Sequence, residues 1–428
     1  MRTPAQPQKA PSMTIPAGPA LLAGHVRNYA WGSHHHLATI QGRRSPTPRP
    51  EAELWFGAHE AGPATIAHPA APIPLDAAIA AAPEAMLGPL TLERFGPRLP
   101  FLLKLLAAAR PLSLQVHPDG ATAAAGFAAE ERAALPRTHP DRCYPDPWPK
   151  PELLRAVTPF AALCGFRPAQ RTLDLLVTLA LPGTDWIERI LRDGGDAVLP
   201  QLVGRLLQLP PPQQRRLLDA LRAAPTPLGA PGSEWTRTQA RIAALDAAYP
   251  DDPGVLVALL LELHELSPGE AIQVPPGTPH AYLEGVGVEV MAASDNVLRG
   301  GLTTKHVDTD GFVAGLAANG TSVGRAPTRQ VRPGHLRHGT RNPYFQLHEY
   351  GDVDGTPVSH DLAPDGPAIV LCLDGEVALG QPECPVTLTA GQAAFLPARS
   401  APCQLRVEGS AVVATAGDGH LDGYPMGV

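Results

Sequence analysis

Short apolar segments separated by Gly and Pro dominate the chain from about residue 21 to residue 165. Examples are "ELWFG", "ATIAH", "LPFLLKLL" and "LSLQVH". Apolar runs of this length, bounded by turn residues, predict β-strands. The alanine-rich "GATAAAGFAAEERAAL" predicts a helix. We therefore expect the first third of the chain to be mainly β-structure with some helix.

The hydrophobic pattern changes between about residues 168 and 250. Segments such as "QRTLDLLVTLA", "DWIERILRDGG" and "PPQQRRLLDALRAA" place apolar residues at i, i+3, i+4 and i+7. This spacing puts the apolar residues on one side of a helix. "DPGVLVALLLELHEL" predicts a closing helix that leads into a strand, and short strands and turns follow from about residue 330. The pattern predicts a helical domain inserted into a β-scaffold.

Two segments, 266–283 and 388–405, form an internal repeat that aligns without a gap. The identical pairs are Leu266/Leu388, Gly269/Gly391, Ala271/Ala393, Pro275/Pro397 and Leu283/Leu405. Both segments predict strand, Gly turn, strand, Pro turn and strand, which is the rhythm of a double-sheet jelly roll. We therefore expect two related β-barrels. Because His280 of the first copy aligns with Pro402 of the second, a metal is expected only in the first barrel.

Composition excludes several function classes. The 428 residues carry 44% hydrophobic and 18% charged residues and a net charge of −7, which argues against a general nucleic-acid binder. No uninterrupted apolar run is long enough to predict a membrane span. The five cysteines form no CxxC pair, which suits a reducing cytoplasm rather than a disulfide framework. Residues 1–20 predict a disordered N-terminal tail.

"SLQVHPDG" places Gln115 and His117 two positions apart on an expected strand that ends at Pro118. Residues at i and i+2 of a strand share a face, so the two side chains can meet either as a hydrogen-bonded pair or at a metal ion. "KPELLRA" adds Glu152 on a strand or helix, and "PPGTPHAYL" adds His280 after a turn. These oxygen and nitrogen donors suit Zn²⁺, with Fe²⁺, Mn²⁺ and Co²⁺ as alternatives. The lack of cysteine favours a catalytic over a closed structural site.

Five longer motifs, taken together, resemble type I mannose-6-phosphate isomerases over nearly the whole chain. They are "YAWGS" (29–33), "AELWFGAH" (52–59), "PFLLKLLAAARPLSLQVHPD" (100–119), "KPELLRAVTPFAALCGFRP" (150–168) and "PHAYLEGVGVEVMAASDNVLRGGLTTKHVD" (279–308). The resemblance implies a cytoplasmic, monomeric enzyme with one Zn²⁺ that interconverts mannose 6-phosphate and fructose 6-phosphate. It also implies a mainly β fold of two cupin-type jelly-roll barrels plus a helical domain.

The resemblance carries over to individual residues. It implies zinc ligation by Gln115, His117, Glu152 and His280, and catalytic roles for Arg299, Glu289 and Lys150, with Lys305 as a further pocket residue. The family typically has Asn-His before the Lys-Pro-Glu core, where this chain has Trp148 and Pro149. That histidine has been considered for opening the sugar ring, so its absence leaves the ring-opening group unassigned.

Aldose–ketose isomerisation passes through a cis-enediolate, whose negative charge a metal and Arg299 would stabilise. The general base is left open between Glu289 and Lys150. In an acidic protein the substrate phosphate needs local donors, for which Lys104, Lys305 and Ser113 are candidates, with Arg110 as an alternative. The full expected substrate-binding set is Lys104, Ser113, Lys305, Tyr282 and Asp295.

The expected domains are a catalytic metal-binding barrel from residues 21–167 and 251–325, a helical insertion at 168–250 and a metal-free barrel at 326–428. Two other functions are kept as alternatives. One is a non-catalytic sugar-binding or regulatory cupin, which the altered "WPKPE" would support. The other is an Fe²⁺-dependent cupin oxygenase, which would leave the basic phosphate-binding candidates unexplained.

Overall fold

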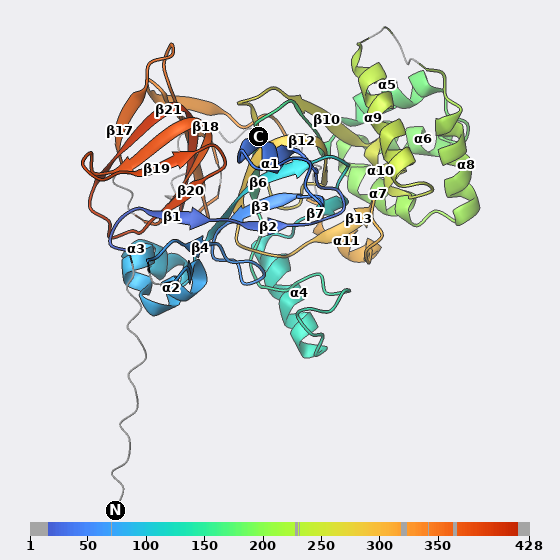
Figure 1. Ribbon diagram of the computed structural model, residues 1–428. Helices are drawn as coiled ribbons and strands as arrows, with labels where there is room; N and C mark the ends of the chain where they lie inside the picture. Colours follow the sequence, from blue (N-terminus) through green and yellow to red (C-terminus); the bar gives the residue numbers. More distant parts are fainter. Residues whose placement is uncertain are drawn as a thin grey trace, which may run out of the picture.

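A computed structural model of the protein describes residues 16–69, 71–226, 230, 232–317, 323–340, 342–362 and 366–417. Figure 1 shows three parts side by side, with the helical block and the C-terminal strands on opposite sides of a central β-barrel. Most of the expected tail, residues 1–15, lies outside the described residues, and Ala20 already begins a strand. Of the helices described, none is both long and apolar enough to cross a membrane.

The central barrel carries the metal-ligand candidates. Its sheet has ten strands among the described residues: β2 (His25–Arg27), β3 (Glu53–Phe56), β6 (Phe101–Ala108), β7 (Leu114–Val116), β8 (Glu152–Ala156), β9 (Phe160–Phe166), β10 (Leu261–Leu266), β11 (Ala271–Val274), β12 (His280–Ala292) and β13 (Leu298–Gly301). The long β12 pairs antiparallel with β6, β7, β8 and β9. It therefore links strands from distant parts of the sequence around one interior.

The C-terminal barrel contains the second sheet. Its eleven described strands are β1 (Ala20–Ala23), β4 (Thr65–Ile66), β5 (Ile73–Pro74), β14 (Thr328–Arg332), β15 (His335–His338), β16 (Gln346–Gly351), β17 (Val358–Leu362), β18 (Ala368–Gly380), β19 (Val386–Thr389), β20 (Ala393–Leu396) and β21 (Cys403–Thr415). Three strands from the N-terminal part join this sheet, because β1 pairs with β20 and with β4, and β4 pairs with β5. The expected domain boundaries stay a prediction. These pairings cross them, because β1, β4 and β5 belong to the expected catalytic domain but lie in the C-terminal sheet.

The described helices include those that the sequence predicts individually and others that it does not. They are α1 (His36–Ile40), α2 (Leu75–Ala81), α3 (Pro83–Phe95), α4 (Gly120–Arg132), α5 (Ala169–Leu179), α6 (Asp185–Gly194), the 3₁₀ helix η1 (Gly195–Val198), α7 (Leu199–Leu207), α8 (Pro211–Arg222), α9 (Glu234–Ala248), α10 (Gly254–Ala258) and α11 (Thr309–Gly315). The alanine-rich segment forms α4, and the periodic block forms α5 to α9. The sequence does not predict α1, α2, α3 and α11. The apolar sides of α5 to α9 share one core with β7 and β9, which fixes the helical block against the central barrel.

The internal repeat is confirmed in structure. Residues 266–283 contain β11 and the start of β12, and residues 388–405 contain β20 and the start of β21. The aligned glycines Gly269 and Gly391 have φ of 92° and 76°. This region is accessible to glycine at little cost, so the two turns require the same residue for the same reason. The fold class of two barrels plus helices is therefore confirmed.

Candidate metal centre

Gln115 lies in the middle of β7, between two strands that carry other candidate residues. In the strand ladder it is paired with His280 of β12 and with Arg299 of β13. Its neighbours Leu114 and Val116 pack into the core shared with the helical block. Because successive side chains of a strand point to opposite faces, Gln115 faces the barrel interior. The strand ends at Val116, so His117 lies directly after it, whereas the sequence predicted a strand that carries His117 and stops at Pro118.

The other ligand candidates lie at the ends of strands. Glu152 begins β8, so the segment that the sequence left open between strand and helix is a strand. His280 begins β12, directly after a turn. The ladder places Glu152 beside Met291 of β12 and Val274 of β11. All three ligand candidates, counting His117, are at least 96% buried.

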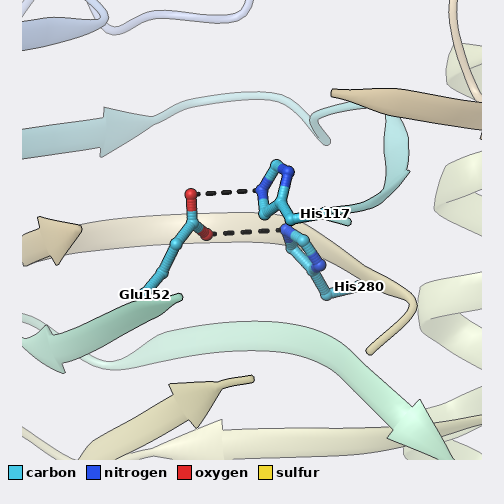
Figure 2. A group of neighbouring side chains, drawn as sticks. All are labelled: His117, Glu152 and His280. Carbon is cyan, nitrogen blue, oxygen red and sulfur yellow. Dashed lines mark ion pairs between the residues drawn. The ribbon is translucent and has the colours of Figure 1, made fainter. Parts of the chain in front are cut away.

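Figure 2 shows the three side chains pointing toward one another, with Glu152 on β8, His280 on β12 and His117 directly after β7. The Nε2 atom of His117 is 3.1 Å from Oε1 of Glu152, and Nε2 of His280 is 3.6 Å from Oε2. One ligand atom from each residue lies within 4.8 Å of the others, and no other such group of His, Cys, Asp and Glu occurs among the described residues. Zn²⁺ with bonds of about 2.1 Å in a tetrahedron needs ligand atoms about 3.4 Å apart, so the spacing fits that ion.

The second nitrogen of each imidazole fixes its tautomer. Nδ1 of His117 is 2.9 Å from the carbonyl oxygen of Asn296, and Nδ1 of His280 is 3.0 Å from the carbonyl oxygen of Thr278. A carbonyl only accepts hydrogen bonds, so each Nδ1 carries the proton and each Nε2 presents a lone pair. This is the orientation found in metal-binding histidines.

The two Nε2 lone pairs face carboxylate oxygens, an arrangement that is repulsive unless a cation lies between them. A proton is disfavoured on His117, because burial and then the Lys150 ammonium lower its pKa to about 3. Burial also lowers the pKa of His280. Burial opposes ionisation of Glu152, but its charged neighbours, the Lys150 ammonium among them, hold its pKa well below the usual range. Neutral imidazoles around an ionised carboxylate are the protonation states that a divalent metal needs.

A second charged cluster lies next to the metal candidates. Lys104 on β6 donates to Oε2 of Glu289 at 2.8 Å, and its Nζ is 3.6 Å from Oε1 of Glu53. Burial lowers the pKa of Lys104, but the two carboxylates outweigh it and raise the pKa above its ordinary value. The ammonium of Lys150 is 3.4 Å from Oε1 of Glu152. Lys104 and Lys150 therefore each contact a buried acid of the site.

A β-bulge in β12 brings Glu289 to the same interior as His280. The register shifts between Tyr282 and Glu284, and Gly285 has a φ of 125°. One extra residue in a strand moves the later side chains to the opposite face. As a result His280 and Tyr282 before the bulge and Glu289 after it all point inward, although Glu289 is an odd number of positions from each of the other two. Burial, followed by the charge of Glu289, raises the pKa of Tyr282 well above its ordinary value.

The remaining predicted residues are more exposed than the buried ligand candidates. Lys305 is exposed, with its Nζ 5.8 Å from the ring centre of Tyr29. Asp295 forms an ion pair with His59 at 3.2 Å. Ser113 is half-buried, directly before β7. Ser113, Asp295 and Lys305 thus lie on segments next to the ligand strands, and their roles stay predictions.

Sequence reasoning missed four residues that the structure places at the site: Arg27, Glu53, His59 and Asn296. Glu53 and His59 fall in "AELWFGAH", a motif that we used for the resemblance without assigning chemistry to it. Asn296 is fully buried, and its side-chain amide donates to the carbonyl oxygen of Trp148 at 2.7 Å. It therefore fixes the segment that lacks the family's histidine, while its own carbonyl orients His117.

Comparison with known proteins gives one consistent result. The family model "Phosphomannose isomerase type I, catalytic domain" matches residues 20–169. Mannose-6-phosphate isomerase of Escherichia coli is 35% identical over 91% of this chain and 97% of its own length. The human mannose-6-phosphate isomerase is 29% identical over 88% of this chain and 92% of its own.

Solved structures agree with the sequence comparisons. A zinc-bound mannose 6-phosphate isomerase superposes with a TM-score of 0.84 and 35% identity, covering 93% of this chain and 99% of that one. A lysine-to-alanine variant of phosphomannose isomerase from Salmonella typhimurium gives a TM-score of 0.85 at 34% identity, with 94% and 100% covered. The buried His-Glu-His cluster and these matches together show that the chain belongs to the type I phosphomannose isomerase family.

Proposed function

We propose that the protein is a zinc-dependent aldose–ketose isomerase that interconverts mannose 6-phosphate and fructose 6-phosphate. The observation that carries the proposal is the pair of buried imidazole lone pairs facing the Glu152 carboxylate, in a chain of this family. His117, Glu152 and His280 would hold one Zn²⁺. The Gln115 amide, paired with His280 in the ladder, would be the fourth ligand.

The reaction moves a proton between C1 and C2 of the open-chain sugar through a cis-enediolate. When bound, Zn²⁺ supplies Lewis-acid stabilisation of the developing oxyanion. Glu289 suits the base that carries the proton, because burial, and then the Glu152 and Glu53 carboxylates, raise its pKa despite the contact with Lys104. A carboxylate with a raised pKa accepts and returns protons near neutral pH. Lys150 stays an alternative base, since it too reaches the Glu152 end of the site.

The substrate phosphate is best matched by Lys305 and Arg27, which lie near the catalytic candidate Arg299. Burial and the positive charge of Arg299 lower the pKa of Lys305 against the opposing Glu53 carboxylate, and Arg27 lowers it further. The guanidinium of Arg27 lies 5.4 Å from the ring centre of Tyr29, against which Lys305 also packs. Among the described residues these three cations form no ion pair with a carboxylate, whereas Lys104 has two such partners. Gathered like charges without a counter-ion favour a dianion such as a phosphate ester.

Two observations bear on the setting of the enzyme. All five cysteines are free thiols, four of them buried, which supports a reducing compartment such as the cytoplasm. Two histidines and one carboxylate would also suit Fe²⁺, so it is the match to mannose-6-phosphate isomerases, a zinc-bound structure among them, that favours an isomerase over an iron oxygenase. A monomer, as the sequence resemblance implies, is part of the same proposal.

The test is turnover of mannose 6-phosphate to fructose 6-phosphate before chelation, after chelation and after zinc is restored. We expect activity that disappears with the metal and returns with Zn²⁺. Restoration by Fe²⁺ alone, with O₂ consumption, would instead indicate the oxygenase. A folded, zinc-loaded protein without turnover would refute the proposal and support a sugar-binding cupin in which Trp148 and Pro149 have ended catalysis.

A further inference from the structure

Strand β8 lies between the metal site and the C-terminal barrel. Its five residues are all buried. Glu152 points to the metal candidates, and Leu154 packs in the core of the catalytic barrel. Leu153, on the opposite face, belongs to a core cluster that includes Phe345 of the C-terminal part. Alternate residues of one short strand therefore face the metal ligands and the neighbouring barrel.

The outer face of β8 also carries a buried arginine with a partner in the other barrel. Arg155 is 8% exposed. Its guanidinium donates to both carboxylate oxygens of Glu349 on β16, with Nε to Oε2 at 3.0 Å, and Nη1 donates to the carbonyl oxygen of Ala156 at 3.0 Å. Glu349 also contacts Nε2 of His338 on β15 at 3.1 Å. This two-pronged geometry fixes the direction as well as the distance of the contact.

Packing beside this ion pair is incomplete. A cavity of about 240 Å³ separates the start of β8 from the C-terminal barrel, with Pro151, Glu152 and Leu153 on one side and Tyr344 and Phe345 on the other. Side chains therefore do not fill the space behind the strand where the metal ligand begins. The Arg155–Glu349 pair is the charged contact that spans the two barrels next to this gap.

The hydrogen bonds between strands do not hold β8 in the direction perpendicular to the sheet, where side-chain contacts such as the Arg155–Glu349 pair act. β8 pairs with β11 on one side and with β12 on the other, and these bonds act within the sheet. Side chains stand roughly perpendicular to a sheet, so movement along that perpendicular changes the distance from the Glu152 carboxylate to the two imidazoles. Contacts on the outer face of β8 decide this position.

We propose that the Arg155–Glu349 ion pair is a positioning device, through which the C-terminal barrel holds β8 and the Glu152 carboxylate in place for the metal. Arg155 and Glu349 are positioning residues because they act through Glu152. The inference rests on the proposed zinc-dependent function and gives the metal-free barrel a role in the site. The ion pair should affect the affinity for zinc more strongly than the rate of turnover.

The experiment measures the zinc dissociation constant by competition with a chromophoric chelator, well below the melting temperature. The variants are Arg155→Met, Glu349→Gln and the double variant. Each single change should weaken zinc binding by about tenfold or more, as is typical when a residue that orients a metal ligand is lost. The double variant should lose less than the product of the two effects, because both remove one interaction. At saturating zinc the metal site is filled in spite of the weaker binding. The loss in kcat should therefore be smaller than the loss in zinc affinity.

Leu388→Ala is the matched control for loss of stability alone. Leu388 is fully buried in the separate core cluster of the C-terminal barrel. This variant should unfold more easily yet keep wild-type zinc affinity. Arg155→Lys, which keeps the charge without the two-pronged geometry, should restore part of the affinity and serves if Arg155→Met does not fold.

Unchanged zinc affinity in Arg155→Met and Glu349→Gln would overturn the proposal, as would an equal loss in Leu388→Ala. Zinc affinity is measured without turnover. A wild-type protein that binds zinc but does not isomerise would therefore end the proposed function while leaving this inference standing.

Discussion

Replacement of Lys104 by methionine distinguishes two roles for this residue. Lys104 either neutralises buried carboxylates of the site or binds the substrate phosphate. Lys104 is 6% exposed, and its ammonium contacts two carboxylates, at 2.8 Å from Glu289 and 3.6 Å from Glu53. Lys104→Met keeps most of the side-chain volume, so the cavity left behind is small. It leaves two buried carboxylates without their cation. Removing one partner of a buried ion pair costs about 3–5 kcal/mol.

The penalty has a defined pH dependence. Without Lys104, burial and repulsion from Glu152 and Glu53 raise the pKa of Glu289 in the folded variant further above the value of about 4.3 in the unfolded chain. The folded variant then binds protons more tightly than the unfolded chain. The loss of stability relative to wild type is therefore small near pH 4.5 and grows as the pH rises toward 8.

The assay is urea unfolding of the metal-free protein followed by circular dichroism between pH 4.5 and 8, together with the KM for mannose 6-phosphate. Lys305→Met is the control, because this exposed lysine is proposed to contact phosphate. We expect it to raise KM by about tenfold, or 1.4 kcal/mol, without changing the free energy of unfolding. A Lys104→Met variant with unchanged stability at pH 8 and a raised KM would refute the reasoning and return Lys104 to the phosphate.

Three further outcomes test the site and its support. His280→Ala should lose zinc and turnover together, and retained stoichiometric zinc, measured by atomic absorption, would contradict the ligand assignment. Arg299→Ala should keep zinc while kcat falls by about 10²–10³-fold, and an unchanged kcat would leave Arg299 only a structural role. Burial opposes ionisation of Glu349, but His338 and Arg155 lower its pKa from 4.5 to about 2, which at 1.36 kcal/mol per pKa unit corresponds to about 3 kcal/mol. This contribution is present above pH 4.5 and lost toward pH 2, so the stability difference between wild type and Glu349→Gln should disappear over that range of acid unfolding.

The chemistry of the site was readable from the sequence wherever it depended on local spacing. The spacing of Gln115 and His117 predicted a shared face because the side chains of a strand alternate, although His117 lies just after the strand. The repeat with its aligned glycines predicted two barrels because one turn conformation requires glycine. The helical block was equally readable from its period. These features depend on residues that are close in sequence, so a pattern of a few residues contains them.

The sequence alone could not show which charged side chains contact one another. The bulge in β12 changes the face of every later residue, so the spacing of His280 and Glu289 predicts opposite faces where the structure has one. Lys104 was assigned to the phosphate by its charge, yet the structure gives it two carboxylate partners from separate strands. Ion pairing is decided by distances of a few ångströms between residues far apart in sequence.

The sequence by itself thus determined the fold class, the family and the set of metal-ligand types, because strand period, glycine turns and motif order are local properties of the chain. Only the tertiary structure decided that both Nε2 lone pairs face Glu152, and that Arg155 reaches Glu349 in the other barrel. The physical reason is that metal geometry and buried charge compensation depend on where separate strands stop relative to one another. Tertiary packing fixes the relative positions of these strand ends, which cannot be read from the order of residues along the chain.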